Sequence, residues 1–268
     1  MANSATTRPG LPADKYVLAT RMLTRRGPAV TAEAAAATGL RGVRGTYRIL
    51  RTDEVDAKDE PLSPAERNNV AATAEAAATR STGDDFTGTA RKAARLSISD
   101  GRIESFADIP DLIHSLPSKS KMVHHHPPIT TDSNSGRVAE EQRNVSINAF
   151  LYAASRENDN DWHLIVGRDP TADPPMYITM EVSGLPPHSN PSFARLKAAR
   201  DAFKAFFGDD LPGASYDFYD PPIPIKVEGS LFFDMSHANG RSPGPPSLHD
   251  DMPVIWEVHP ISHLVFEP

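Results

Sequence analysis

The stretch NVSINAFLY, residues 144–152, decides the fold that this sequence predicts, because its apolar and polar side chains alternate. Successive side chains of a β-strand point to opposite faces of the sheet. One face of this stretch carries the apolar residues Val145, Ile147, Ala149 and Leu151. The same period of two recurs in four later stretches, residues 162–166, 176–183, 225–233 and 254–258. The pattern predicts five strands, each with an apolar face that packs into a core.

A helix is predicted between the third and fourth of these strands. Asn190-Pro191 is a helix start signal, a stripe of apolar residues from Phe193 to Phe206 follows, and Gly208 ends it. The order strand, strand, strand, helix, strand, strand is that of an OB-fold, a five-stranded Greek-key barrel. A partly open β-sandwich and an α+β sheet carry the same order and remain alternatives. We therefore expect residues 138–268 to form a mainly β domain built as an OB-like five-stranded barrel.

The first half of the chain lacks this alternation. We expect residues 1–116 to be a loosely packed, partly flexible α-helical region, with a short basic amphipathic helix over residues 14–26. A second helix is expected to start at Ser63, where Ser-Pro-Ala-Glu forms a capping box, and to offer mostly alanine for packing. Residues 117–137, rich in Pro, Ser, Lys and Asn, are predicted to be a linker.

Composition narrows the classes of function. The 268 residues contain no cysteine, which excludes disulfides, thiolate metal ligands and cysteine nucleophiles. No run approaches the roughly 20 apolar residues of a membrane-spanning helix, and the N-terminus lacks the apolar segment of a secretion signal. We expect a cytoplasmic protein without a membrane partner.

The charge of the chain is unevenly distributed and bears on its partners. Residues 138–268 hold 9 Lys and Arg against 19 Asp and Glu, and the whole chain has a net charge of −7. Nucleic acid is a frequent OB-fold ligand, and the outward aromatic residues Phe150, Tyr152, Tyr177 and Phe232 could stack on bases. A surface that follows phosphates needs an excess of basic residues, so nucleic acid is an unlikely partner. We expect these rings to pack beneath the first half of the chain.

Four strings within residues 138–268 carry a resemblance to known sequences. They are SRENDNDWH at 155–163, EVSGLP at 181–186, GSLFFD at 229–234 and WEVHP at 256–260. As a set they resemble a family of uncharacterised bacterial proteins. The resemblance implies a discrete domain over residues 138–268 and implies no activity, cofactor or partner.

The polar faces of the predicted strands and the loop after the fourth strand supply six candidate ligand-binding residues. These are His163, Glu181, Asp234, His237, Glu257 and His259. In an OB topology His163 and Glu181 are cross-strand neighbours, with Glu257 and His259 within reach of Glu181. Imidazole combined with carboxylate suits zinc, manganese or iron, so a divalent metal is the candidate cofactor. The simpler alternative is that these residues face solvent or form ordinary hydrogen bonds.

Two loops would flank a ligand in this topology, residues 156–161 and residues 235–253. Glu157, Asp159 and Asp161 alternate like the start of an EF-hand, but Trp162 stands where that loop needs glycine, so a polar hairpin turn is predicted. The neighbouring histidines at 124–126 are expected to be incidental, because adjacent side chains of an extended segment diverge.

No P-loop, dinucleotide fingerprint or G-x-S-x-G motif is present in the sequence. We therefore expect a non-catalytic OB-like domain that binds a small molecule or a protein through its two loops. The first alternative is a metal-dependent, phosphoesterase-like hydrolase that uses His, Asp and Glu on the barrel surface. The weaker alternative is binding of single-stranded nucleic acid.

Overall fold

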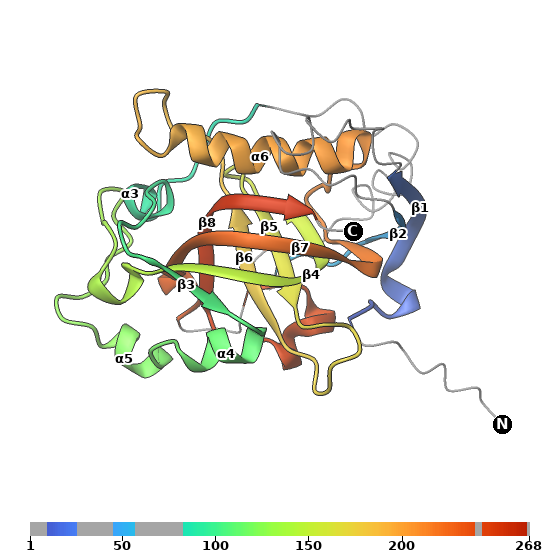
Figure 1. Ribbon diagram of the computed structural model, residues 1–268, viewed down its shortest axis with the longest axis horizontal. Coiled ribbons are helices and arrows are strands. Elements are labelled where there is room, and N and C mark those ends of the chain that lie inside the picture. Colours follow the sequence, from blue (N-terminus) through green and yellow to red (C-terminus); the bar gives the residue numbers. More distant parts are fainter. Residues whose placement is uncertain (1–9, 26–44, 57–82, 239–242, 267–268) are drawn as a thin grey trace.

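The protein is built on one mixed β-sheet of eight strands (Figure 1). This computed structural model describes residues 10–25, 45–56, 83–238 and 243–266. The strands are β1 (Val17–Arg25), β2 (Gly45–Thr52), β3 (Ile103–Phe106), β4 (Asn144–Arg156), β5 (Trp162–Gly167), β6 (Tyr177–Val182), β7 (Asp217–Phe233) and β8 (Trp256–Phe266). Their order across the sheet is β1-β2-β7-β8-β6-β5-β4-β3, and β7 pairs in addition with β4.

Hydrogen bonding joins five of these strands in a closed ring. β4 pairs with β5, β5 with β6, β6 with β8, β8 with β7, and β7 with β4. The β6–β8 pair is parallel and the other four are antiparallel. With 17 residues, β7 is long enough to pair with both β4 and β8, which closes the ring. Near its start, β7 also pairs with β2.

Within the described residues, helices are few and mostly short. The longest, α6 (Phe193–Phe207), follows β6 and lies along one side of the sheet, where it contacts β8 (Figure 1). The others are α3 (Lys92–Arg95), α4 (Ile109–His114) and α5 (Lys119–Val123), with the 3-10 helices η1 (Asp14–Tyr16), η2 (Ala139–Glu141), η3 (Gly208–Asp210), η4 (Met235–His237) and η5 (Pro246–Asp251). Among the described residues, no helix combines the length and the apolar character needed to cross a membrane.

The main core is formed by the apolar strand faces that the alternating pattern predicted. Its buried members include Val145, Ile147, Ala149, Leu151, Trp162, Leu164, Val166, Ile178, Met180, Val182, Ile225, Val227, Leu231, Phe233, Trp256 and Val258. The predicted stripe of α6 joins them, and the ring of Phe203 stacks on that of Trp162 with centroids 4.8 Å apart. The phase of all five predicted strands is confirmed.

The prediction of a five-stranded barrel as the whole sheet is wrong. β1, β2 and β3 come from the first half of the chain and extend the sheet to eight strands. β2 adds to the sheet along the start of β7, where Arg48 pairs with Asp220 and Arg51 with Asp217. β3 runs parallel to the start of β4. The free backbone N–H and C=O groups along β4 and β7 form hydrogen bonds with these added strands. The alternation of side chains within a strand does not indicate whether such a partner exists.

The expected helical character of residues 1–116 is also wrong for the described part of that region. Residues 17–25 form strand β1 rather than an amphipathic helix, and they pair antiparallel with β2. Helix in the described part of residues 1–116 is limited to η1, α3 and α4. Pairing with β2 satisfies the backbone of β1 and overrides its local helical pattern, as tertiary context often does. The helix expected to start at Ser63 lies outside the described residues.

The segment 117–137, expected to be a linker, packs against the sheet. It contains α5 and buries the side chains of Met122 and Ile129. Its Pro117 carbonyl accepts a hydrogen bond of 2.9 Å from Nε1 of Trp256. Its three histidines belong to no group of potential metal ligands among the described residues.

Candidate functional site

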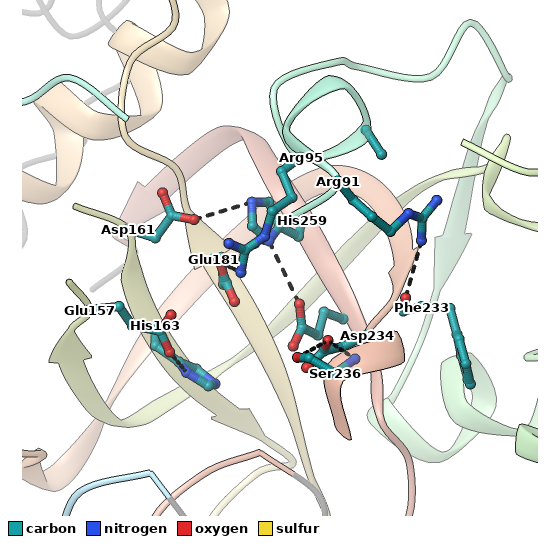
Figure 2. A network of polar contacts seen from close by, with 12 residues as sticks. Arg91, Arg95, Glu157, Asp161, His163, Glu181, Phe233, Asp234, Ser236 and His259 are labelled. Carbon is teal, nitrogen blue, oxygen red and sulfur yellow. Dashed lines mark hydrogen bonds and ion pairs between the residues drawn. The ribbon is translucent and has the colours of Figure 1, made fainter. Parts of the chain in front are cut away.

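A pocket of about 270 Å³ gathers most of the predicted ligand-binding residues. Its lining consists of Asp56, Arg95, Glu157, Asn158, Asp159, His163, Glu181, Asp234, Ser236, His237 and Glu257. Five of the six candidates are among them, and the sixth, His259, lies directly behind Glu181. Figure 2 shows His163 and Glu181 side by side, with Arg95 reaching toward Glu181.

Three neighbouring strands supply the floor of the pocket. His163 of β5 is the register partner of Glu181 of β6, and Glu257 of β8 pairs with Thr179 of β6. His259 stands two residues beyond Glu257 on the same strand, so both side chains lie on one face. The cross-strand neighbours predicted from the alternation are thus in contact range.

The simpler alternative was that these residues face solvent or form ordinary hydrogen bonds. Its solvent-facing half is wrong, whereas His163 and His237 do form hydrogen bonds with neighbouring carboxylates. Each of the six candidate residues is 8% exposed or less, and His259 is not exposed at all. A second apolar cluster covers part of the same sheet face, with Leu50, Tyr216 and Leu248 among its members. Buried ionisable groups are rare unless they are paired or bind a ligand.

The first ligand group consists of Asp56, Glu157 and His163, each offering one ligand atom within 4.8 Å of the others. Glu157 follows β4 in the hairpin turn, and its Oε1 lies 2.7 Å from Nδ1 of His163. Asp56 follows β2, and its Oδ2 lies 4.0 Å from the same nitrogen and accepts a 2.8 Å hydrogen bond from the Gly244 amide. A carboxylate from each half of the chain therefore faces one imidazole.

The electrostatics of this first group are strongly coupled. Burial alone would lower the pKa of His163, but the hydrogen bond and charge of Glu157, with the charges of Glu181 and Asp56, raise it to about 9. Burial alone would raise the pKa of Asp56, but His237, His163 and the Gly244 amide lower it to about 2. Without another cation, the imidazolium of His163 is what balances these carboxylates at neutral pH.

The second ligand group consists of Asp234, His237 and Glu257, again with ligand atoms within 4.8 Å of one another. Asp234 ends β7 and caps η4, where its Oδ1 accepts a 2.8 Å hydrogen bond from the Ser236 amide. Its Oδ2 contacts Nδ1 of His237, and such a contact fixes the orientation of an imidazole. Burial, followed by repulsion from Glu181 and Asp234, raises the pKa of Glu257 well above its usual value.

A third group of potential ligands, Asp161, Glu181 and His259, lies next to the pocket and is held together by ion pairs. Oδ2 of Asp161, Oε2 of Glu181 and both ring nitrogens of His259 make no hydrogen bond of standard geometry with the described residues. His259 Nδ1 is 2.8 Å from Oε2 of Glu181, and its Nε2 is 3.4 Å from Oδ2 of Asp161 (Figure 2). Arg95 of α3 donates a 2.5 Å hydrogen bond to Asp159 and lies 3.7 Å from Glu181. Burial lowers the pKa of His259, against the opposing effect of Glu181. This group supports the pocket floor from beneath.

Three buried atoms of the pocket residues lack a hydrogen-bond partner among the described residues. They are Nε2 of His163, Oε2 of Glu257 and Oε2 of Glu181, the last of which lies 2.8 Å from Nδ1 of His259. Nδ1 of His259 lies 3.6 Å from Oε2 of Glu257, beyond hydrogen-bond distance. An unsatisfied buried polar group costs about 1–3 kcal/mol, and such groups often mark the place of a ligand, water or ion. Carboxylates and imidazoles together are ligands for manganese, zinc or iron.

Sequence reasoning missed several residues of this pocket. Asp56 and Arg95 come from the first half of the chain, where no periodicity marks them. Glu157 and Asp159 were identified only as part of a polar turn, and they do lie in the β4–β5 hairpin turn. That turn is also one wall of the pocket, so the alternation of acidic residues in it was an informative signal.

The other predicted features lie elsewhere. Tyr152, Tyr177 and Phe232 are 3% exposed or less, so these rings are not available for stacking on bases. Within the second loop, His249 contacts the Gly244 carbonyl at 2.6 Å and does not line the pocket. Residues 239–242 of that loop lie outside the described residues.

The four strings that carry the sequence resemblance each contribute to this site. They provide Glu157, Asp159 and His163, then Glu181, then Asp234, and finally Glu257 and His259. No protein-family model, no curated protein and no solved structure matches the chain. Its function therefore has to follow from the chemistry of the pocket.

Proposed function

We propose that the protein is a divalent-metal-dependent hydrolase of phosphate esters, with this pocket as its active site. The observation that carries the proposal is the convergence of six carboxylates and two imidazoles in one largely buried pocket. A purely structural role would not need so many like charges in one place.

The charge of the pocket favours a bound cation. Six carboxylates face one guanidinium and two imidazoles, and Asp159 is already paired with Arg95. Carboxylates crowded in a buried site retain protons or bind cations, since several adjacent negative charges are unfavourable. Burial, then repulsion from Glu181 and Asp234, raises the pKa of Glu257, so a cation bound there would displace a proton.

The chemistry of such a site is hydrolytic. A bound divalent cation lowers the pKa of a coordinated water and so supplies hydroxide at neutral pH. The groups around Glu157 and Asp234 would hold the cation, and the paired carboxylates would orient His163 and His237. Arg95 supplies a fixed positive charge that suits an anionic oxygen of the substrate. Oxygen-rich cation sites commonly work on phosphate groups, which bridge metal and arginine.

The strand order supports an OB-like arrangement for β4–β8 within the larger sheet. Three antiparallel strands are followed by α6 and two further strands, and the ring of pairings includes the parallel β6–β8 pair. An OB-fold binds its ligand on its second and third strands between the first–second and fourth–fifth loops. The pocket occupies the equivalent place, on β5 and β6 between the β4–β5 turn and the residues after β7.

A non-catalytic ligand-binding domain is the second candidate, because the same two loops flank the pocket in either case. A small molecule or a segment of a protein partner would then bind without turnover. Nucleic acid is disfavoured as a ligand by the acidic lining and by the buried aromatic rings.

Metal loading followed by an activity assay tests the proposal. Chelator-treated protein is supplied with Mn²⁺, Zn²⁺ or Mg²⁺ and assayed with p-nitrophenyl phosphate and bis(p-nitrophenyl) phosphate. We expect metal-dependent hydrolysis that falls by about 10–100-fold in Glu257→Gln, since loss of groups that support a metal site typically weakens affinity or activity by that factor. The matched control is Asp201→Asn, a carboxyl on the exposed side of α6 with 55% side-chain exposure.

The outcomes separate the candidate functions. Metal retention without hydrolysis of either ester would favour the ligand-binding domain. No metal retention and no hydrolysis would refute the proposed active site.

A further inference from the structure

The pocket contains two separate sets of ligands. Asp56, Glu157 and His163 form one set, and Asp234, His237 and Glu257 form the other. No residue belongs to both sets. Each set pairs one histidine with one carboxylate through Nδ1, at 2.7 Å for Glu157 and His163 and in a close contact for Asp234 and His237.

Asp56 lies between these two sets. Its Oδ1 is 3.3 Å from Nε2 of His237, and its Oδ2 is 4.0 Å from Nδ1 of His163. The two oxygens of one carboxylate thus face the two histidines, one from each set. A carboxylate placed in this way has the geometry of a bridging ligand.

Each set also has its own unsatisfied buried atom. Nε2 of His163 belongs to the first set and Oε2 of Glu257 to the second, and neither has a hydrogen-bond partner among the described residues. Both residues line the pocket and are 2% exposed or less. Each of the two sets therefore holds a buried ligand atom that a cation could satisfy.

The charge balance agrees with two cations. With Asp159 neutralised by Arg95, five lining carboxylates remain: Asp56, Glu157, Glu181, Asp234 and Glu257. One divalent ion would leave most of this negative charge uncompensated when the histidines are neutral ligands. Two divalent ions would nearly balance it. Of these five, Glu181 also belongs to the third group, where it lies 2.8 Å from Nδ1 of His259.

We propose that the pocket binds a pair of divalent cations bridged by Asp56, and that its substrate class is phosphate esters cleaved between the two ions. The inference rests on the proposed function and adds to it the number of ions and the role of Asp56. Two-metal sites of this kind hold their ions about 3.5–4 Å apart and stabilise both the attacking and the leaving oxygen. Water adds to phosphorus as the bond from phosphorus to the ester oxygen breaks. The products are phosphate and an alcohol, whose oxygen takes the proton that the water gives up.

The bridge also explains how the two halves of the chain cooperate. Asp56 follows β2, and β2 joins the sheet through β7, whose end supplies Asp234. Pairing of β2 with β7 therefore brings the bridging carboxylate to the pocket. On this basis, the site is complete only when the first-half strands are in place.

Metal stoichiometry tests the proposal with Mn²⁺ as the probe. Full-length protein is equilibrated with Mn²⁺ by dialysis, bound metal is counted by mass spectrometry, and electron paramagnetic resonance detects coupling between neighbouring ions. We expect two coupled ions per chain in the wild-type protein. Glu157→Gln and Glu257→Gln should each lower the count to one, whereas Asp56→Asn should abolish the coupling and weaken both sites at least 10-fold. Asp201→Asn should retain two coupled ions.

The outcomes distinguish this inference from the proposed function. A single bound ion in an active wild-type protein would overturn the pair of cations and leave the hydrolase proposal intact. No bound ion and no hydrolysis would overturn both. Two ions without coupling, or coupling that persists in Asp56→Asn, would overturn the bridging role. Circular dichroism shows whether Asp56→Asn folds. If it does not, the number of Mn²⁺ ions bound per wild-type chain and the coupling between them still test the proposed pair of cations.

Discussion

Replacing Glu257 by glutamine distinguishes a metal site from a purely structural network of charges. The side chain is 2% exposed, and its Oε2 has no hydrogen-bond partner among the described residues. Glutamine keeps the shape of the side chain and removes its charge. We expect the metal-free variant to be at least as stable as the metal-free wild type, and to lose most of the stabilisation that a cation provides.

The direction follows from the pKa of Glu257. Burial, then repulsion from Glu181 and Asp234, raises this pKa well above the ordinary value of 4.5. A carboxyl with a raised folded-state pKa binds more protons in the folded than in the unfolded protein. Its contribution to stability is therefore lost as the pH rises from about 4.5 toward the folded-state pKa. Above that range the metal-free wild type carries a penalty that the glutamine variant lacks.

The magnitude of the metal effect can be worked out for one ion. A cation at 100 times its dissociation constant stabilises the folded state by about 2.7 kcal/mol. One kcal/mol shifts the melting temperature by about 2–4 °C for a chain of roughly this size, so the expected shift is about 5–11 °C. If the variant binds about 100-fold more weakly, the same relation gives about 0.4 kcal/mol, which is about 1–2 °C.

Thermal melts at pH 8 with chelator or with Mn²⁺ provide the assay, with Asp201→Asn as the control. The metal-site interpretation requires the full metal-induced shift in the wild type and in the control, and in Glu257→Gln a shift smaller by the contribution of the ion that Glu257 binds. If Glu257 instead stabilised the fold through His259, 3.6 Å away, the metal-free variant would melt several degrees below the metal-free wild type. Equal metal-induced shifts in both proteins would refute the reasoning.

Three further outcomes test other parts of the structure. Burial alone would lower the pKa of His163, but the neighbouring carboxylates raise it to about 9. Cation binding near pH 7 should therefore release a proton from His163 and become tighter as the pH rises toward 9. Calorimetry in buffers of different ionisation enthalpy measures this release, and its absence would contradict the prediction. Trp256→Ala should lower the free energy of unfolding by about 3–5 kcal/mol, because this core side chain also donates to the Pro117 carbonyl; an unchanged urea midpoint would contradict its place in the core. Arg91→Met should lower the free energy of unfolding by about 3–5 kcal/mol, because it leaves the fully buried Glu141 without the guanidinium 2.7 Å away. In urea denaturation, the double variant Arg91→Met/Glu141→Leu should recover much of that loss. A double variant as unstable as the single one would show that the loss does not come from an uncompensated charge.

The sequence by itself determined the phase of the strands in the second half of the chain. Alternation with a period of two is a local property, and a slip of one residue would turn every apolar side chain out of the core. For this reason the inward faces of β4 and β5 were predictable residue by residue. The cross-strand pair His163 and Glu181 was predicted from the same alternation together with the order of strands in an OB topology.

The tertiary structure decided which further strands join the sheet and how deeply the polar face is buried. β1 has a local pattern compatible with a helix, and only its pairing with β2 makes it a strand. Partners so distant in sequence leave no mark on local periodicity. The same long-range pairing explains why Asp56 lies in the pocket and why Leu50 helps to cover a sheet face that alternation alone would leave to solvent. The alternation of side chains depends only on neighbouring residues. The burial that shifts the pKa values of the polar side chains depends on segments far away in the chain.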